Sequence, residues 1–310
     1  MTLSISAAIV GVAWTHDLGA FMSNIPGTNN DYNGTRHDHP ELYLTYGAWS
    51  SVFRVHCSHY EPRPWVYPNS ELLFAAYRLR NDLVPCIYTA ACCWCTRCTP
   101  TSRRRSRPTR SRPQRPNSTL QYCFGDVFVV APITQQVHPG GGLVAWETWV
   151  PPGQCVDWQT GDVLVGPRTR TRQYGLEETP VLARAGAVVP MKGFADSQAT
   201  SPSTLVVAVA WAAGASSSAE LYEDDGGDFG HEASRFRLAV LEQNTAATGR
   251  LPLAERGNAT ETVVRIRPAV SGAGFRMEAS YRSYLIRLRN APKAVAGMTS
   301  PQWPHGLEHW

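Results

Sequence analysis

The sequence predicts an α/β part followed by an all-β part: strand–helix units of a (β/α) architecture, then two small β-sandwich domains. Three observations predict this order. Residues 1–91 combine a short apolar strand, a polar loop and helix-like stretches. Residues 92–120 lose all hydrophobic periodicity and are rich in Arg, Cys, Pro, Ser and Thr. From Gln121 onward, short β-type segments alternate with Gly and Pro turns.

Two helices are expected in the first part, over Pro40–Phe53 and Ser70–Thr89. Asn69 and Ser70 offer an N-cap to the second helix. Its apolar residues recur at helical spacing and form one stripe (Leu72, Leu73, Ala76, Leu79, Leu83 and Ile87).

The expected strands fall into two blocks, which we assign to a proximal sandwich (121–200) and a distal one (201–310). Two segments of the distal block, TVVRIR and YLIRLR, alternate apolar and polar residues, as half-buried antiparallel strands do. The expected strands are Asp126–Pro132, Leu143–Val150, Pro180–Ala183, Ala187–Pro190, Thr204–Trp211, Ala219–Glu223, Phe236–Leu241, Thr262–Arg267 and Tyr284–Arg289.

Charge and composition exclude several classes of partner. The formal charge is +4, but seven arginines lie between Arg103 and Arg115, and without them the charge becomes −3. The basic balance therefore indicates no nucleic-acid partner for the whole protein. No apolar run approaches the roughly 18 residues of a membrane span, which predicts no membrane partner. The eight cysteines lack the paired spacing of a zinc site, so no metal or cofactor is expected.

The Arg/Cys-rich segment, residues 92–120, admits three interpretations: phosphate binding by arginines, metal binding by cysteines, or translation out of frame. We favour the last and expect the segment to be disordered or extended. CGN, CCN and TGC codons are common when a GC-rich gene is read in a shifted frame.

A series of motifs in one order resembles glycoside hydrolase family 31, the α-glucosidase and α-xylosidase family. WTHDLGAF (Trp14–Phe21) resembles the family's W-S/T-H-D-I-G-G-F segment, with Ala20 in place of the second glycine. Six further segments are similar to family motifs in the same order: PELYLTYGAWSSVFRVHC (40–57), YRLRNDLVPCIYTAA (77–91), QYCFGDVFVVAPI (121–133), WVPPGQCVDWQTGD (149–162), PVLARAGAVVPM (180–191) and LYEDDG (221–226).

The resemblance implies that residues 1–91 are the C-terminal part of a (β/α)8 TIM barrel and that the two β-sandwich domains follow it. It also implies retaining hydrolysis of α-glucosidic or α-xylosidic bonds by two aspartates, with carboxylates about 5–5.5 Å apart. Neither catalytic motif occurs here, and no Asp or Glu precedes Asp17. We therefore expect no catalytic residue in this chain and no activity of the chain alone.

By position in the motifs, Asp17, Phe21 and His56 match residues that line the family's sugar pocket. A carboxylate and an imidazole suit vicinal hydroxyls, and an aromatic ring packs on the sugar's C–H face. Without the resemblance, Asp17 would be assigned to a cap or turn and His56 to a buried, hydrogen-bonded histidine. The expected partner is a carbohydrate substrate, an α-glucoside or α-xyloside. A separate polypeptide carrying the first half of the barrel would be a further partner. The rival hypothesis is a non-catalytic carbohydrate-binding or regulatory β-sandwich protein.

Several other carboxylates are assigned to turns. Glu223, Asp224, Asp225 and Asp228 lie in EDDGGD, whose glycines are turn signals. Asp157 and Asp162 of DWQTGD are likewise expected in a loop or turn.

Overall fold

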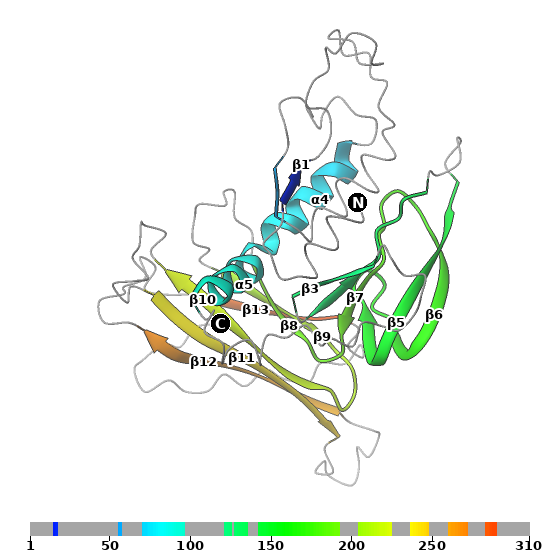
Figure 1. The fold of residues 1–310 in the computed structure, drawn as a ribbon. Coiled ribbons are helices and arrows are strands. Elements are labelled where there is room, and N and C mark those ends of the chain that lie inside the picture. Colours follow the sequence, from blue (N-terminus) through cyan, green and yellow to red (C-terminus); the bar gives the residue numbers. More distant parts are fainter. Residues whose placement is uncertain are drawn as a thin grey trace, which may run out of the picture.

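The computed structural model describes residues 15–17, 55–57, 70–96, 121–125, 127–135, 142–192, 204–224, 236–247, 260–271 and 283–289 (Figure 1). Phe21, the expected helix over residues 40–53 and residues 97–120 lie outside the described residues. These residues form a pair of barrel-type strands, one helical pair and the β part of the chain.

Within the described residues, the elements follow one another as two short strands, two helices and a long run of strands. All nine expected strands are confirmed, with their ends shifted, whereas β2, β3 and β6 were not predicted. The elements are β1 (Thr15–Asp17), β2 (Val55–Cys57), α4 (Ser70–Asp82), α5 (Val84–Thr96), β3 (Tyr122–Phe124), β4 (Phe128–Val130), β5 (Val144–Asp157), β6 (Val163–Tyr174), β7 (Val181–Arg184), β8 (Val188–Lys192), β9 (Thr204–Ala210), β10 (Ser216–Asp224), β11 (Phe236–Ala247), β12 (Thr260–Ser271) and β13 (Ser283–Arg289).

The expected helix over Ser70–Thr89 is present as two helices that meet at Leu83. Pro85 explains the break, because it lacks a backbone N–H and disfavours helical geometry at Val84 before it. The second helix also extends further than expected. It ends at Thr96, so the first five residues of the Arg/Cys-rich segment are helical and not disordered or extended, because α5 continues past Ala91 without a helix breaker.

The strands form four hydrogen-bonded groups. β1 and β2 pair in parallel, and a five-stranded sheet has the order β3-β4-β7-β5-β6. Two three-stranded sheets follow, with the orders β13-β9-β8 and β10-β11-β12. Because β8 pairs with β9, the first of these sheets contains strands from both sides of residue 200. The chain thus has a barrel-type parallel pair and sheets of the β-sandwich type.

The direction of β13 corrects one expectation. Its alternation was interpreted as antiparallel pairing, but β13 runs parallel to β9, with Tyr284 opposite Leu205. Alternation reports that a strand is half-buried and carries no information on strand direction. By contrast, β12 does pair antiparallel with β11, as expected.

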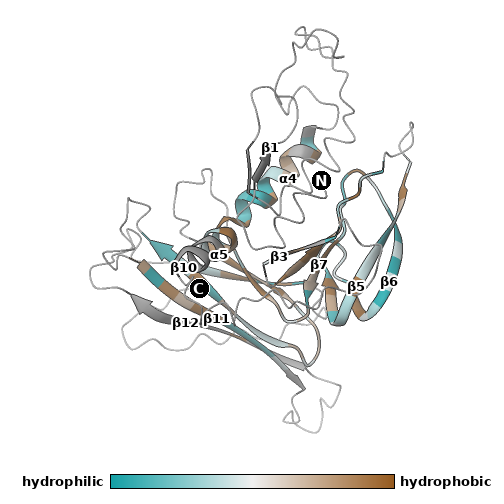
Figure 2. Ribbon diagram, in the orientation of Figure 1, coloured by the Kyte–Doolittle hydropathy of each residue, from teal (hydrophilic) through white to brown (hydrophobic). Residues whose placement is uncertain are grey.

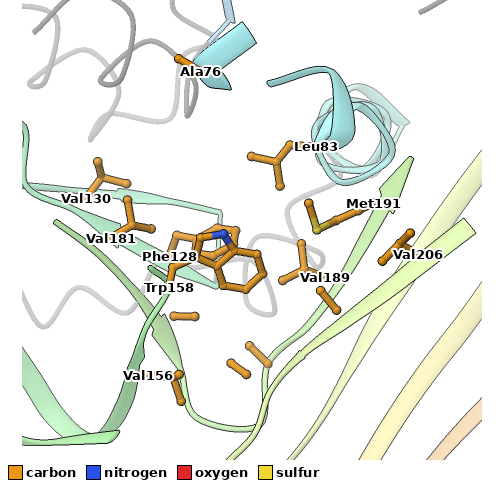
Figure 3. Packing of buried hydrophobic residues seen from close by; sticks show 14 residues of the cluster. Ala76, Leu83, Phe128, Val130, Val156, Trp158, Val181, Val189, Met191 and Val206 are labelled. Carbon is orange, nitrogen blue, oxygen red and sulfur yellow. The ribbon is translucent and has the colours of Figure 1, made fainter. Parts of the chain in front are cut away.

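One hydrophobic cluster joins the helices to the sheets (Figure 3). Ala76 belongs to the apolar stripe of α4, and Leu83 is the residue between the two helices. Both pack into the same cluster as Phe128 and Met191. Trp158 lies at its centre, with its ring edge-on to Phe128 at a centroid distance of 4.9 Å. The helical pair is therefore part of the core of the β region.

A second cluster lies between the two three-stranded sheets. Leu205, Val207 and Val209 of β9 pack against Leu221 of β10 and Leu241 of β11. In the five-stranded sheet, β6 is largely hydrophilic and β7 is largely hydrophobic (Figure 2). This difference explains why β7 was predicted from its apolar run and β6, with its Arg and Thr residues, was not.

Candidate functional site

Two of the three candidate sugar-binding residues, Asp17 and His56, lie on the parallel pair β1–β2, and Phe21 is outside the described residues. Asp17 is the last residue of β1, and His56 is the central residue of β2. The register pairs His16 with His56 and Asp17 with Cys57, so Asp17 and His56 are one step apart on neighbouring strands. In a (β/α)8 barrel the carboxyl ends of parallel strands form the edge that carries the active site. The structure thus brings these two segments, 39 residues apart in sequence, to the same sheet edge.

Asp157, the first carboxylate of DWQTGD, has a structural role in the described part of the chain. Its side chain is 3% exposed, and Oδ1 accepts the backbone N–H groups of Gln159 and Thr160. Its Oδ2 lies 2.8 Å from Nη1 of Arg170, and Arg170 also contacts Asp162 at 3.2 Å. The expectation that Asp157 lies in a loop or turn is corrected: it is the last residue of β5, from which its carboxylate holds the turn that follows, whereas Asp162 lies in the loop before β6, as expected.

The arginines that pair with Asp157 were missed because β6 itself was not predicted. Arg170 and Arg172 lie two residues apart on β6, so both side chains point to the same face. Arg172 also pairs with Glu178 and lies over the ring of Tyr174 at 4.7 Å. Burial lowers the pKa of Arg172, but its hydrogen bond to Glu178 and the nearby negative charges raise it above its ordinary value overall. These contacts join β5 to β6 and to the loop that follows β6, which gives the carboxylates of this group partners within the fold.

Glu223 and Asp224 lie at the end of β10, while Asp225 and Asp228 are outside the described residues. A carboxylate oxygen of Glu223 lies 3.3 Å from Nη2 of Arg237, on the neighbouring strand β11. Asp224 accepts a hydrogen bond of 2.7 Å from the hydroxyl of Tyr88 in α5. Both carboxylates therefore have partners within the fold.

Two further kinds of feature, a metal site and a membrane span, concern the described residues only. In that part of the chain, no group of three or more His, Cys, Asp or Glu side chains is arranged to hold a metal ion. Nor does any described helix have the length and apolar character that crossing a membrane requires.

Two family models match the chain in consecutive ranges. The TIM-barrel domain of glycosyl hydrolases family 31 matches residues 1–90, and the family 31 C-terminal domain matches residues 109–189. Together these ranges cover more than half of the chain. The chain belongs to glycoside hydrolase family 31.

Curated relatives of this family 31 chain include an alpha-xylosidase from Saccharolobus solfataricus, 27% identical over 236 residues. A 1,6-alpha-glucosyltransferase from Sporosarcina globispora is 25% identical over 247 residues. These matches cover 74% and 76% of the chain but 30% and 18% of the relatives. The chain thus spans less than a third of the length of either relative.

Solved structures show the same fold. A family 31 dextranase from Flavobacterium johnsoniae, in complex with isomaltotriose, has a TM-score of 0.52 at 19% identity and covers 67% of this chain and 26% of its own. The family 31 alpha-xylosidase from Xanthomonas citri has a TM-score of 0.50 at 21% identity, and the match covers 75% of this chain and 28% of the xylosidase. The expected combination of part of a TIM barrel with β-sandwich sheets is therefore confirmed.

Residues 91–108 lie between the two matched ranges and are covered by neither. The C-terminal family model includes residues 109–120, the end of the Arg/Cys-rich segment. We propose that the part of the segment before residue 109 is read in a shifted frame, because neither family model matches it and it has no apolar periodicity. The genetic code makes this proposal specific. In one shifted frame, each codon takes the third base of one triplet and the first two bases of the next. Across CCWC (Cys92–Cys95) this frame encodes Leu, Leu and Val, whichever cysteine codons are used. The pair Ala91–Cys92 reads Leu, Met or Val in the same frame.

Sequencing of the gene and its transcript across codons 88–122 tests this proposal. We expect the shifted frame to be open throughout and to encode a buried strand beginning with this apolar run. The other shifted frame reads Ala or Val at Cys92–Cys93 and at Cys93–Trp94, and Gly at Trp94–Cys95, and a strand disfavours that glycine. A stop codon within the first frame would contradict the proposal.

Proposed function

We propose that this chain contributes the C-terminal wall of a family 31 sugar site, in which Asp17, Phe21 and His56 bind an α-glucosyl or α-xylosyl unit. The observation that carries the proposal is the parallel pairing of β1 with β2, which brings the two segments that hold Asp17 and His56 side by side at one sheet edge. The family match over residues 1–90 supports it.

Each of the three residues has a distinct chemical task in this proposal. The Asp17 carboxylate accepts hydrogen bonds from sugar hydroxyls, and the His56 imidazole donates to or accepts from a neighbouring hydroxyl. The Phe21 ring packs against the apolar C–H face of the sugar. The xylosidase and dextranase relatives act on sugars of this general kind, as their names state.

The associated reaction is hydrolysis of an α-glucosidic or α-xylosidic bond with retention of configuration. Such a reaction needs a nucleophilic carboxylate and a second carboxyl group that protonates the leaving oxygen. The motifs that carry these groups do not occur in the 310 residues. A polypeptide of this sequence is therefore proposed to bind sugar without cleaving it, because the groups that form and break the bonds are missing.

A hydrolysis assay tests the catalytic part of the proposal. The purified chain, incubated with 4-nitrophenyl α-glucoside and 4-nitrophenyl α-xyloside, is expected to release nitrophenol no faster than buffer does. The control is an Asp17→Asn variant prepared in the same way, which distinguishes a contaminating hydrolase from the chain itself. Hydrolysis by the unsubstituted chain that the variant lacks would refute the proposed inactivity.

A further inference from the structure

Two side chains that carry only hydrogen-bond donors meet where β13 lies against the turn after β5. The guanidinium of Arg289, in β13, lies over the ring of Trp158, with Cζ 4.0 Å from the ring centre. Its Nη1 donates to the backbone carbonyl of Trp158. Because arginine and tryptophan side chains have N–H donors and no acceptor, neither side chain can accept a hydrogen bond from the other.

Each of the two side chains keeps a buried N–H group without an acceptor in the part of the chain that the structure describes. Trp158 is 2% exposed, and its indole Nε1 has no hydrogen-bond partner. Nε of Arg289 is likewise buried and without a partner. A buried donor that lacks an acceptor costs free energy, and the cost is larger for a charged group. One acceptor that reaches both N–H groups removes both costs.

The charge at this place is positive. Among the described residues, no carboxylate forms an ion pair with Arg289. Burial and, to a smaller extent, the charge of Arg287 lower the pKa of Arg289 to about 10. Burial raises the pKa of Asp82 in α4, and the charge of Arg287 partly offsets that rise. Arg287 thus acts on a carboxylate within the fold, whereas Arg289 is a partly buried cation to which the described residues supply no counter-charge.

Backbone hydrogen bonds and ring packing hold both residues in place. The N–H of Trp158 donates to the carbonyl of Val181 at 2.8 Å, and the N–H of Trp211 donates to the carbonyl of Arg289 at 3.1 Å. The ring of Trp158 also packs edge-on against Phe128. The two donors therefore have fixed positions in the folded chain, which is the preorganisation that favours binding of a small ligand.

We propose that Trp158 and Arg289 bind one small monovalent anion, such as chloride, which accepts the indole N–H and the Nε–H together. A single-atom ion suits this place because it accepts hydrogen bonds from any direction. The several oxygens of sulfate or phosphate need more donors than these two N–H groups offer. The bound ion ties β13 to the turn after β5, and its binding stabilises the folded state because the unfolded chain has no such site.

Thermal unfolding of the full chain tests the proposal, with sodium chloride replacing sodium gluconate stepwise up to about 200 mM so that ionic screening stays constant. We expect Tm to rise by about 4 °C and then to level off, as it does when a ligand reaches roughly 100 times its dissociation constant in a chain of this size. Bromide should act as chloride does. In crystals grown with bromide, its anomalous signal should appear beside Nε1 of Trp158.

Trp158→Phe keeps a ring beneath the guanidinium and removes the indole N–H, so we expect the chloride-dependent rise in Tm to be largely lost. The matched control is Trp149→Phe, the same change at a half-buried tryptophan of β5, which should keep the full rise. If Trp158→Phe does not fold, Arg289→Lys carries the same test, because it keeps the charge and removes Nε. A Tm of the unsubstituted chain that does not depend on chloride would overturn the proposal, as would an equal rise in Trp158→Phe.

Discussion

Replacement of Gly166 by alanine is expected to destabilise the protein by about 3 kcal/mol or more, at the upper end of the range for overpacking. A Cβ atom at this position would lie 1.9 Å from the carbonyl oxygen of Pro151 and 2.5 Å from that of Val150. Both obstacles are backbone atoms of β5, beside the irregularity between Val150 and Gly153 that faces Gly166. Relief of the clash therefore requires the two longest paired strands of the five-stranded sheet to separate.

The measurement is urea denaturation followed by tryptophan fluorescence, with the midpoint and slope compared between variants. The control is Gly175→Ala. There the Cβ atom would meet the end of the Glu177 side chain, which can move aside. We expect a small change for Gly175→Ala and a large one for Gly166→Ala. Equal losses for the two variants would contradict the arrangement of β5 and β6.

Trp158→Ala is expected to cost about 3–5 kcal/mol, as removal of a buried aromatic side chain does. Trp158 is 2% exposed and packs edge-on against Phe128. The guanidinium of Arg289 lies 4.0 Å from the centre of its ring and also bonds the Trp158 carbonyl. Burial, together with the charge of Arg287, lowers the pKa of Arg289 to about 10. The substitution thus opens a cavity and removes the ring over which the partly buried guanidinium of Arg289 lies.

Thermal unfolding monitored by circular dichroism measures this effect. A loss of this size in a chain of 310 residues corresponds to a fall of roughly 5–8 °C in Tm. Trp158→Phe retains an aromatic ring and should lose clearly less. Because Arg289 belongs to β13, we also expect faster amide exchange in β13 of the alanine variant. An alanine variant with unchanged Tm would show that Trp158 does not lie in the core.

The elements that could be predicted from the sequence are those whose pattern of apolar residues follows the burial of their side chains. β7, β8 and β9 are apolar runs, and the structure buries almost every residue of β8 and β9. By contrast, β6 carries Arg168, Arg170 and Arg172 on one face, and a strand at the edge of a sheet needs no apolar run. Strand direction is also hidden, as β13 shows, because a half-buried parallel strand and a half-buried antiparallel strand have the same alternation.

The candidate site could be predicted from motifs and not from periodicity. WTHDLGAF and FRVHC locate Asp17 and His56 through their resemblance to family 31, and the structure adds that β1 and β2 are neighbours in parallel register. Contacts that depend on tertiary packing could not be predicted. The bond between Thr89 and Tyr222 joins residues 133 positions apart, and nothing local to either residue indicates it.

The central claim is that Asp17 and His56 form the wall of a sugar site. Saturation-transfer NMR with methyl α-glucoside and methyl α-xyloside tests it most directly, using the full chain and the variants Asp17→Asn and His56→Gln. The account predicts saturation transfer to at least one of the two sugars from the unsubstituted chain, and its loss in each variant while the fold is retained. Transfer that is unchanged in both variants would contradict the account and place carbohydrate binding on the β-sandwich part of the chain. Transfer to neither sugar from the unsubstituted chain would contradict it as well.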